Sequence, residues 1–119
     1  MTAERDAECL FCKIVAGEIP STTVFKDDQV TAFRDINPAM PTHVLIVPNR
    51  HIPTTEALAP SDDALVGLLV RTAKDIAANE GLSDRGYRLV LNTGPDALNS
   101  VPHLHLHLLG GRAMTWPPG

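Results

Sequence analysis

The sequence has few aromatic residues, two cysteines and no long apolar run. Phe, Trp and Tyr make up 4% of its 119 residues. No 18 consecutive residues are apolar, so a membrane-spanning helix is not expected. The segment Met1–Glu8 is polar and charged and lacks the apolar centre of a secretory signal, which predicts a cytoplasmic protein. In that compartment the two cysteines are expected to be reduced thiols.

The chain also lacks an excess of basic residues. Its formal net charge is −4, and no run of Lys and Arg occurs. Neither a nucleic-acid partner nor an anionic membrane is therefore expected, although a small phosphorylated ligand needs only a local site. The length fits one domain over residues 1–119.

Hydrophobic spacing and turn residues predict an α+β fold with an antiparallel sheet. A short helix is expected at 11–16, ended by Gly17, and a long helix at 62–79 with Ser61 as its N-cap. Strands are expected at 21–26, 29–34, 43–47 and 87–92 and in the segment 102–109.

The segment Pro102–Leu109 contains three of the five histidines, alternating with leucines. Alternation at period two is a strand pattern, so the three imidazoles are expected on one face. On a strand, His103 and His107 would lie about 13 Å apart, too far to bind one metal ion together. The histidines are therefore expected to have different roles. The alternatives are a histidine-rich strand without chemistry and a chance metal-binding tract.

The residues before this segment favour anion binding. Asn92–Asp96 is rich in turn residues, and Asn99 and Ser100 stand just before the histidines. Such a loop can direct backbone N–H groups and a hydroxyl at a phosphate. An imidazole beside it is largely neutral at pH 7 and suited to attack phosphorus. Phosphoryl or nucleotidyl transfer is the chemistry that this combination indicates.

The chain resembles a known family in several motifs. His103-Leu104-His105-Leu106-His107-Leu108-Leu109 is similar to the histidine triad, in which histidines alternate with apolar residues. Segments 9–20, 32–38 and 41–48 and the tail 110–119 resemble the Hint branch, the histidine triad nucleotide-binding proteins. The resemblance implies a five-stranded antiparallel sheet with one long and one short helix.

The resemblance also implies a function. It suggests a hydrolase that binds a purine nucleotide and cleaves phosphoramidates or acyl-nucleotides to the monophosphate, with no cofactor needed for the chemistry. His105 would form a covalent nucleotidyl-histidine, assisted by His107, His43 and Ser100. The residues that would contact the nucleotide are Phe11, Ile14, Ile19, Phe33, Asp35, Ile36, Asn92, Leu98, Asn99, Ser100, His105 and His107.

One loop departs from that pattern. Ala97-Leu98-Asn99 stands where the family usually has Gly-Gly-Gln or a close variant. If the backbone there needs a positive φ, Leu98 would be strained where glycine would not be.

The cysteines indicate a second site. Cys9 and Cys12, together with His51 and His103, would make a four-coordinate structural zinc centre, and the resemblance implies the same set. The alternatives are a redox pair and two inert buried thiols. A redox motif would need a thioredoxin-like βαβ context, which the sequence lacks.

Two other functions stay open. One is hydrolysis of dinucleoside polyphosphates, and the other is a nucleotide-binding regulator with little turnover. A sugar-phosphate nucleotidylyltransferase is disfavoured, because the related branch has Gln where this chain has His107.

The resemblance further implies a homodimer in which the tail around Trp116 approaches the partner's site. The alternative is a frayed tail.

Overall fold

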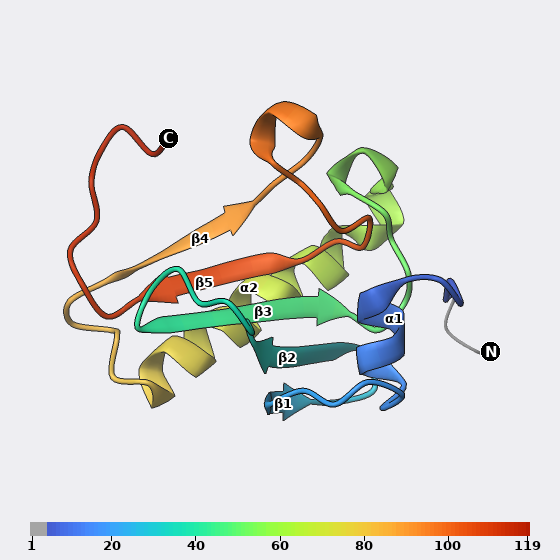
Figure 1. The fold of residues 1–119 in the computed structure, drawn as a ribbon, viewed down its shortest axis with the longest axis horizontal. Coiled ribbons are helices and arrows are strands. Elements are labelled where there is room, and N and C mark those ends of the chain that lie inside the picture. Colours follow the sequence, from blue (N-terminus) through green and yellow to red (C-terminus); the bar gives the residue numbers. More distant parts are fainter. Residues whose placement is uncertain (1–4) are drawn as a thin grey trace.

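The computed structural model describes residues 5–119, so the first four residues of the polar segment Met1–Glu8 lie outside it. A five-stranded sheet forms the centre of the fold (Figure 1). Every neighbouring pair of strands is antiparallel, in the order β1-β2-β3-β5-β4. The strands are β1 (Thr23–Lys26), β2 (Val30–Arg34), β3 (Thr42–Pro48), β4 (Tyr87–Leu91) and β5 (Leu106–Gly110). The predicted α+β fold with an antiparallel sheet is confirmed.

Two helices flank the sheet, α1 (Leu10–Val15) and α2 (Asp63–Asn79), and both were expected from the sequence. Single 3-10 turns occur at Thr55–Ala57 (η1), Pro60–Asp62 (η2) and Pro95–Ala97 (η3). Within residues 5–119, no helix has both the length and the apolar character that crossing a bilayer requires.

The predicted N-cap of the long helix is wrong. Ser61 lies inside the 3-10 turn η2, and Asp62 is the residue that precedes α2. The Asp62 carboxylate accepts the backbone N–H of Ala59 and pairs with Arg50, so it is engaged outside the helix. Pro60 favours the tight turn because its φ is already helical.

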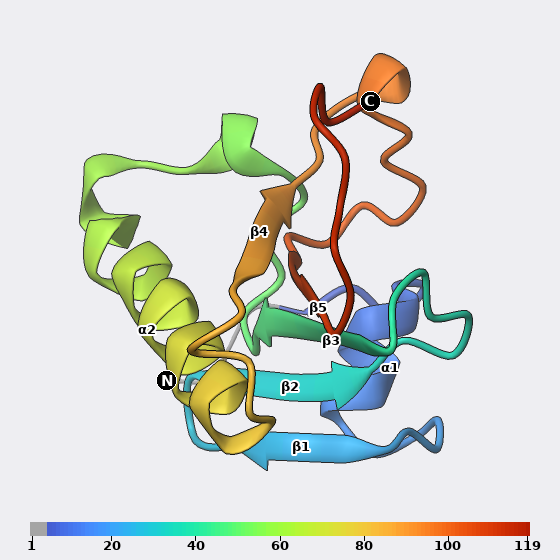
Figure 2. The ribbon, with the colours of Figure 1, turned by 90° about the vertical axis from the view of Figure 1, so that its left-hand side faces the viewer.

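The two faces of the sheet have different partners. Val44 and Ile46 of β3 lie in the core cluster that includes Leu69 of α2. The opposite face carries Phe33 and Leu45, which pack with residues of α1. Figure 2 shows the helices on opposite sides of the sheet. Because α1 is only six residues long, it does not close this face completely, and a pocket remains beside it.

The histidine strand begins later than the alternation predicts. β5 starts at Leu106, so His103 lies in a bend before it and His105 in the irregular residues that lead into the strand. The ladder between β3 and β5 ends at the pair Ile46–Leu106, close to Pro48, which has no N–H to donate. The Pro48 carbonyl instead accepts the Nε2–H of the His103 ring at 2.9 Å. The alternation itself persists, because Leu104, Leu106 and Leu108 all lie in the core on the α2 side.

The backbone of Leu98 has a positive φ, the conformation in which the sequence analysis expected strain for a leucine. Its φ is 60° and its ψ 35°, and within the described residues it is the sole non-glycine residue with positive φ. The side chain is 85% exposed, so no packing compensates for the unfavourable backbone.

Leu98→Gly is therefore expected to raise the free energy of unfolding by up to about 1 kcal/mol, because the relief of strain exceeds the added entropy of the unfolded chain. Urea unfolding measures it. Ala97→Gly is the matched control, since Ala97 lies in the 3-10 turn, and it is expected to destabilise. Equal effects of both variants would contradict the strain at Leu98.

Candidate active site and metal centre

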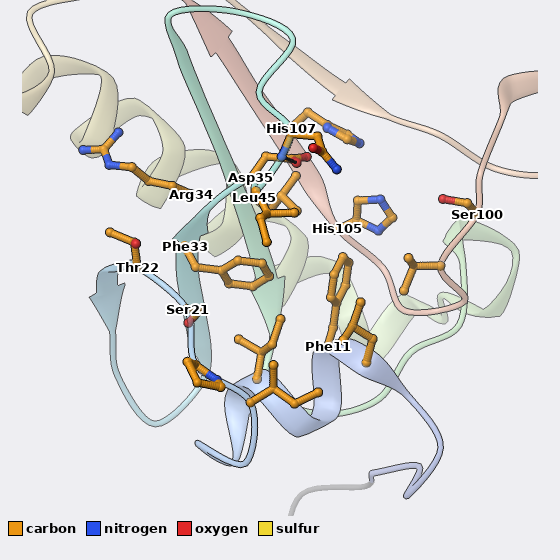
Figure 3. Close-up of a pocket in the computed structure, with 17 residues that line it drawn as sticks. Phe11, Ser21, Thr22, Phe33, Arg34, Asp35, Leu45, Ser100, His105 and His107 are labelled. Carbon is orange, nitrogen blue, oxygen red and sulfur yellow. Dashed lines mark hydrogen bonds between the residues drawn. The ribbon is translucent and has the colours of Figure 1, made fainter.

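The open face of the sheet contains a pocket of about 690 Å³ (Figure 3). Its walls come from α1, the segment 19–22, β2 and the following loop, and the segment that leads into β5. The lining residues that the sequence predicted are Phe11, Ile14, Ile19, Phe33, Asp35, Ile36, Ser100, His105 and His107.

One part of this pocket is apolar. The rings of Phe11 and Phe33 meet edge to face, with centroids 5.4 Å apart and an interplanar angle of 69°. Both rings are buried, and Leu45 lies beside them across the sheet. Ile14 and Ile19 complete this wall. Such an arrangement can hold a flat aromatic ring by contact over its faces.

His105 stands where the apolar part meets the polar part. Its Nδ1 lies 2.7 Å from the carbonyl oxygen of His103, so Nδ1 carries a proton and donates it to that oxygen. In the neutral ring the lone pair is then on Nε2. The side chain lines the pocket although the residue is only 9% exposed. His105 therefore has the protonation pattern of a nitrogen nucleophile that is held in place from behind.

In His107 a chain of hydrogen bonds places the proton on the other ring nitrogen, Nε2. The Ala39 N–H donates to Nδ1 of His43 at 3.0 Å, so the proton of neutral His43 is on Nε2. That Nε2–H donates to Nδ1 of His107, with the two nitrogens 2.9 Å apart. Neutral His107 must then carry its own proton on Nε2. His107 thus offers an N–H donor, whereas His105 offers a lone pair.

Burial favours the neutral form of both His43 and His107. It lowers the pKa of His43 below the ordinary value, against the raising effect of the Asp35 carboxylate. Burial also lowers the pKa of His107 to about 4, and the rings of His105 and His43 add to this shift. At neutral pH the hydrogen-bonded chain therefore carries no positive charge of its own.

Four predicted residues lie outside the pocket wall. His43 lies behind His107, and the amide nitrogen of Asn92 lies 3.5 Å from Nε2 of His107. Leu98 points into solvent, and Asn99 is half-buried with its Oδ1 buried and unpartnered among the described residues. Of the loop residues before the histidines, Ser100 and Val101 reach the pocket.

Sequence reasoning missed several lining residues: Leu10, Pro20, Ser21, Thr22, Arg34, Asn37, Leu45 and Val101. Leu45 could have been found from the strand register, because it pairs with both Phe33 and His107. The residues of the segment 20–22 carry no pattern that links them to the histidines. Their place depends on how the chain crosses from α1 to β1.

The predicted metal ligands come together on the far side of His105. The two Sγ atoms and two Nδ1 atoms of Cys9, Cys12, His51 and His103 all lie within 4.8 Å of one another. Nδ1 of His103 is 3.3 Å from Sγ of Cys9, 3.5 Å from Sγ of Cys12 and 3.3 Å from Nδ1 of His51. Both cysteines are free thiols and buried.

These distances fit a tetrahedral zinc ion. Its usual bond lengths place two nitrogens about 3.4 Å apart and a nitrogen and a sulfur about 3.6 Å apart. The tautomer of His103 fits too, because its Nε2–H donates to the Pro48 carbonyl and leaves Nδ1 free to bind a cation. Burial lowers the pKa of His103 to about 4, which keeps that nitrogen unprotonated.

A second cluster of side chains that can bind metals is not suited to hold a metal ion. Asp35, His43 and His107 also bring one donor atom each within 4.8 Å. However, Nδ1 of His43 already accepts the Ala39 N–H, so Nε2 holds the proton that a metal would have to displace. This cluster is a hydrogen-bonded chain.

Comparison with known proteins agrees with this arrangement. A model of the HIT domain family matches residues 16–114. The chain belongs to the HIT domain family. It is similar to a HIT family hydrolase of known structure from Legionella pneumophila Philadelphia 1, with 54% identity, a TM-score of 0.93, and coverage of 94% of this chain and 100% of that one.

Two curated relatives are similar over most of their length. One is a 14 kDa zinc-binding protein from Zea mays, 50% identical over 96% of this chain and 90% of the relative. The other is a purine nucleoside phosphoramidase from Escherichia coli strain K12, 47% identical over 90% of both chains.

Cys12→Ser is expected to lose bound zinc and to lower Tm, because metal binding is coupled to folding. Elemental analysis and thermal unfolding measure the two effects. Thr72→Ser, at a similarly buried position on α2, is the control that should keep the metal. Full zinc content in Cys12→Ser would contradict the assignment of this ligand.

Stability is expected to fall as pH drops from about 6.5 to about 4. The unfolded chain has an ordinary histidine pKa near 6.5 and binds a proton that folded His107, with its pKa of about 4, does not. His107→Gln removes this difference, so its free energy of unfolding should depend less on pH. Urea unfolding of both proteins across this range gives the slopes, and parallel curves would refute the assignment.

Proposed function

We propose that this HIT-family hydrolase cleaves purine nucleoside phosphoramidates and acyl-nucleotides to the nucleoside monophosphate through a nucleotidyl-histidine at His105. The observation that carries the proposal is the bond from the His105 Nδ1–H to the His103 carbonyl at 2.7 Å, which leaves the Nε2 lone pair for the substrate. The phosphoramidase from Escherichia coli supports the substrate class.

In the first step, Nε2 of His105 forms a bond to the α-phosphorus while the bond from phosphorus to the leaving nitrogen or acyl oxygen breaks. The leaving group takes that electron pair, and a leaving amine also takes a proton through the Ser100 hydroxyl or from solvent. The Nε2–H of His107 donates to a phosphoryl oxygen and stabilises the charge that develops there. In the second step, water attacks phosphorus and releases a proton to solvent, the bond from phosphorus to Nε2 breaks, and Nε2 of His105 recovers its electron pair.

The rest of the pocket fits a nucleotide. The purine would lie against Phe11 and Phe33, whose rings form the apolar wall. Asp35 would accept the ribose hydroxyls with the lone pairs that remain beside its bond from the Asn37 N–H. This position places the sugar between the apolar wall and the histidines.

The zinc centre has a structural role in this proposal. Cys9, Cys12, His51 and His103 would hold the ion and cross-link α1 to the segment before β5. Zinc bound there would add folding free energy and would form no bond to the groups that react. His105 makes no contact with the metal-binding atoms, so its nucleophilic nitrogen stays free of the ion.

The active form is proposed to be a homodimer. Trp116 is 79% exposed, and the Arg88 guanidinium lies 5.8 Å from the centre of its ring. β4 has one free edge in the sheet, beside this tail. A second copy on that side would cover the indole.

His105→Ala is expected to lower kcat for adenosine phosphoramidate by more than about a hundredfold, because the nucleophile is removed. Mass spectrometry of the enzyme quenched during turnover should show the nucleotidyl mass in wild type on the peptide with His105, and none in the folded variant. Retention of wild-type kcat would overturn the proposal.

The same assay separates the other candidate functions. Faster turnover of diadenosine polyphosphate than of the phosphoramidate would place the protein among polyphosphate hydrolases. Tight binding of AMP without turnover of either substrate would show a nucleotide-binding regulator.

A further inference from the structure

The metal-binding cluster and the proposed nucleophile are connected by two separate contacts. We infer that the Cys9–Cys12–His51–His103 centre orients His105, and that Phe11 is a positioning residue through which α1 acts on that ring. The inference rests on the proposed role of His105 as nucleophile. It assigns to the metal centre an effect on the chemistry beyond holding the fold together.

The first contact runs through the backbone. His103 is fully buried, and its ring is held at both nitrogens, by the Pro48 carbonyl and by the cluster. The carbonyl of the same residue accepts the Nδ1–H of His105. A change in how the His103 ring is held therefore changes the direction of the carbonyl that fixes the tautomer of His105.

The second contact runs through α1. This helix has six residues, too few to be stable alone, and Cys9 is its N-cap, with Sγ accepting the Cys12 N–H at 3.4 Å. Phe11 stands between the two cysteines and meets the His105 ring edge to face, at 5.0 Å between centroids and 85°. It also lies 6.0 Å from the ring of His103. Holding the cysteines thus holds Phe11 against the nucleophile.

Both contacts act on one property of His105. A neutral imidazole has its proton on one nitrogen, and the partner of the other nitrogen decides which. With the carbonyl at Nδ1 and Phe11 beside the ring, the lone pair stays on Nε2, toward the pocket. Without them, the ring gains rotational freedom and the second tautomer, whose Nε2 is protonated and cannot attack.

The test is a measurement of the tautomer of His105 by ¹⁵N NMR of the imidazole nitrogens in the full-length protein. The zinc-loaded wild type is expected to show Nδ1–H alone. After chelation of the metal, a mixture of the two tautomers is expected, with a fall in kcat of about 10–100-fold, the usual effect of a residue that orients a reacting group from behind. An unchanged tautomer in a folded, metal-free protein would overturn the inference.

Phe11→Leu tests the second contact with the metal in place. It keeps an apolar side chain in the pocket but removes the edge of the ring from His105. The expected result is full zinc content with a mixed tautomer and a lowered kcat. Full zinc content together with Nδ1–H alone would overturn the role of Phe11.

A destabilised control separates this effect from loss of stability. Leu69→Ala weakens the core on the α2 side, away from the cluster, and should leave both the tautomer and kcat unchanged. A mixed tautomer in this variant would refute a specific path from the metal centre. Because the NMR readout needs no turnover, failure of the proposed hydrolysis, seen as an absent nucleotidyl adduct, is distinguishable from failure of this inference.

Discussion

The hydrogen bond from the His105 Nδ1–H to the carbonyl of His103 is the constraint on which the site depends. The two histidines are two residues apart in the sequence. His105 faces the pocket, and His103 faces the two cysteines. A residue of the metal-binding cluster and the proposed nucleophile are thereby linked within three residues of the chain. The pocket, the sheet face and the metal centre all meet at this bond.

The chemistry proposed for the site depends on which nitrogen of each histidine carries the proton. In water an imidazole exchanges its proton between nitrogens, and at pH 7 part of the population is charged. Here the Ala39 N–H, the Asp35 carboxylate and the apolar surroundings give each ring a defined role. His105 accepts a bond, and His107 donates one. Two chemically identical side chains therefore present opposite groups to the pocket, because Nδ1 of His105 faces a backbone carbonyl and Nδ1 of His107 faces the His43 ring.

Much of the fold could be predicted from the sequence, because local patterns report it directly. The alternation at 103–108 placed the leucines in the core and the histidines on the other side, and the Gly17 stop marked the end of α1. The start of β5 could not be predicted, since it depends on Pro48 in a strand that is distant in sequence. The N-cap of α2 was missed for the same reason, because Arg50 engages the Asp62 carboxylate from another segment.

The candidate site, like the fold, has parts that the sequence could predict and parts that depend on residues distant in sequence. The histidine triad, Phe11, Phe33 and Asp35 were found because their motifs resemble a family. The bonds that give them their protonation states join residues such as Ala39 and His43, or His103 and Pro48, through folded geometry. Only the three-dimensional arrangement specifies which nitrogen carries a proton.

The position of β5 has a consequence for how the protein is made. This strand is the last of the five in sequence order, yet it lies between β3 and β4. During translation, the strands that emerge first have no central partner, and their backbone edges stay exposed. The core stays incomplete, and the His105 imidazole has no place beside the pocket, until β5 has been made and has paired with β3 and β4. The proposed active site therefore cannot form on a chain in which β5 has yet to be made.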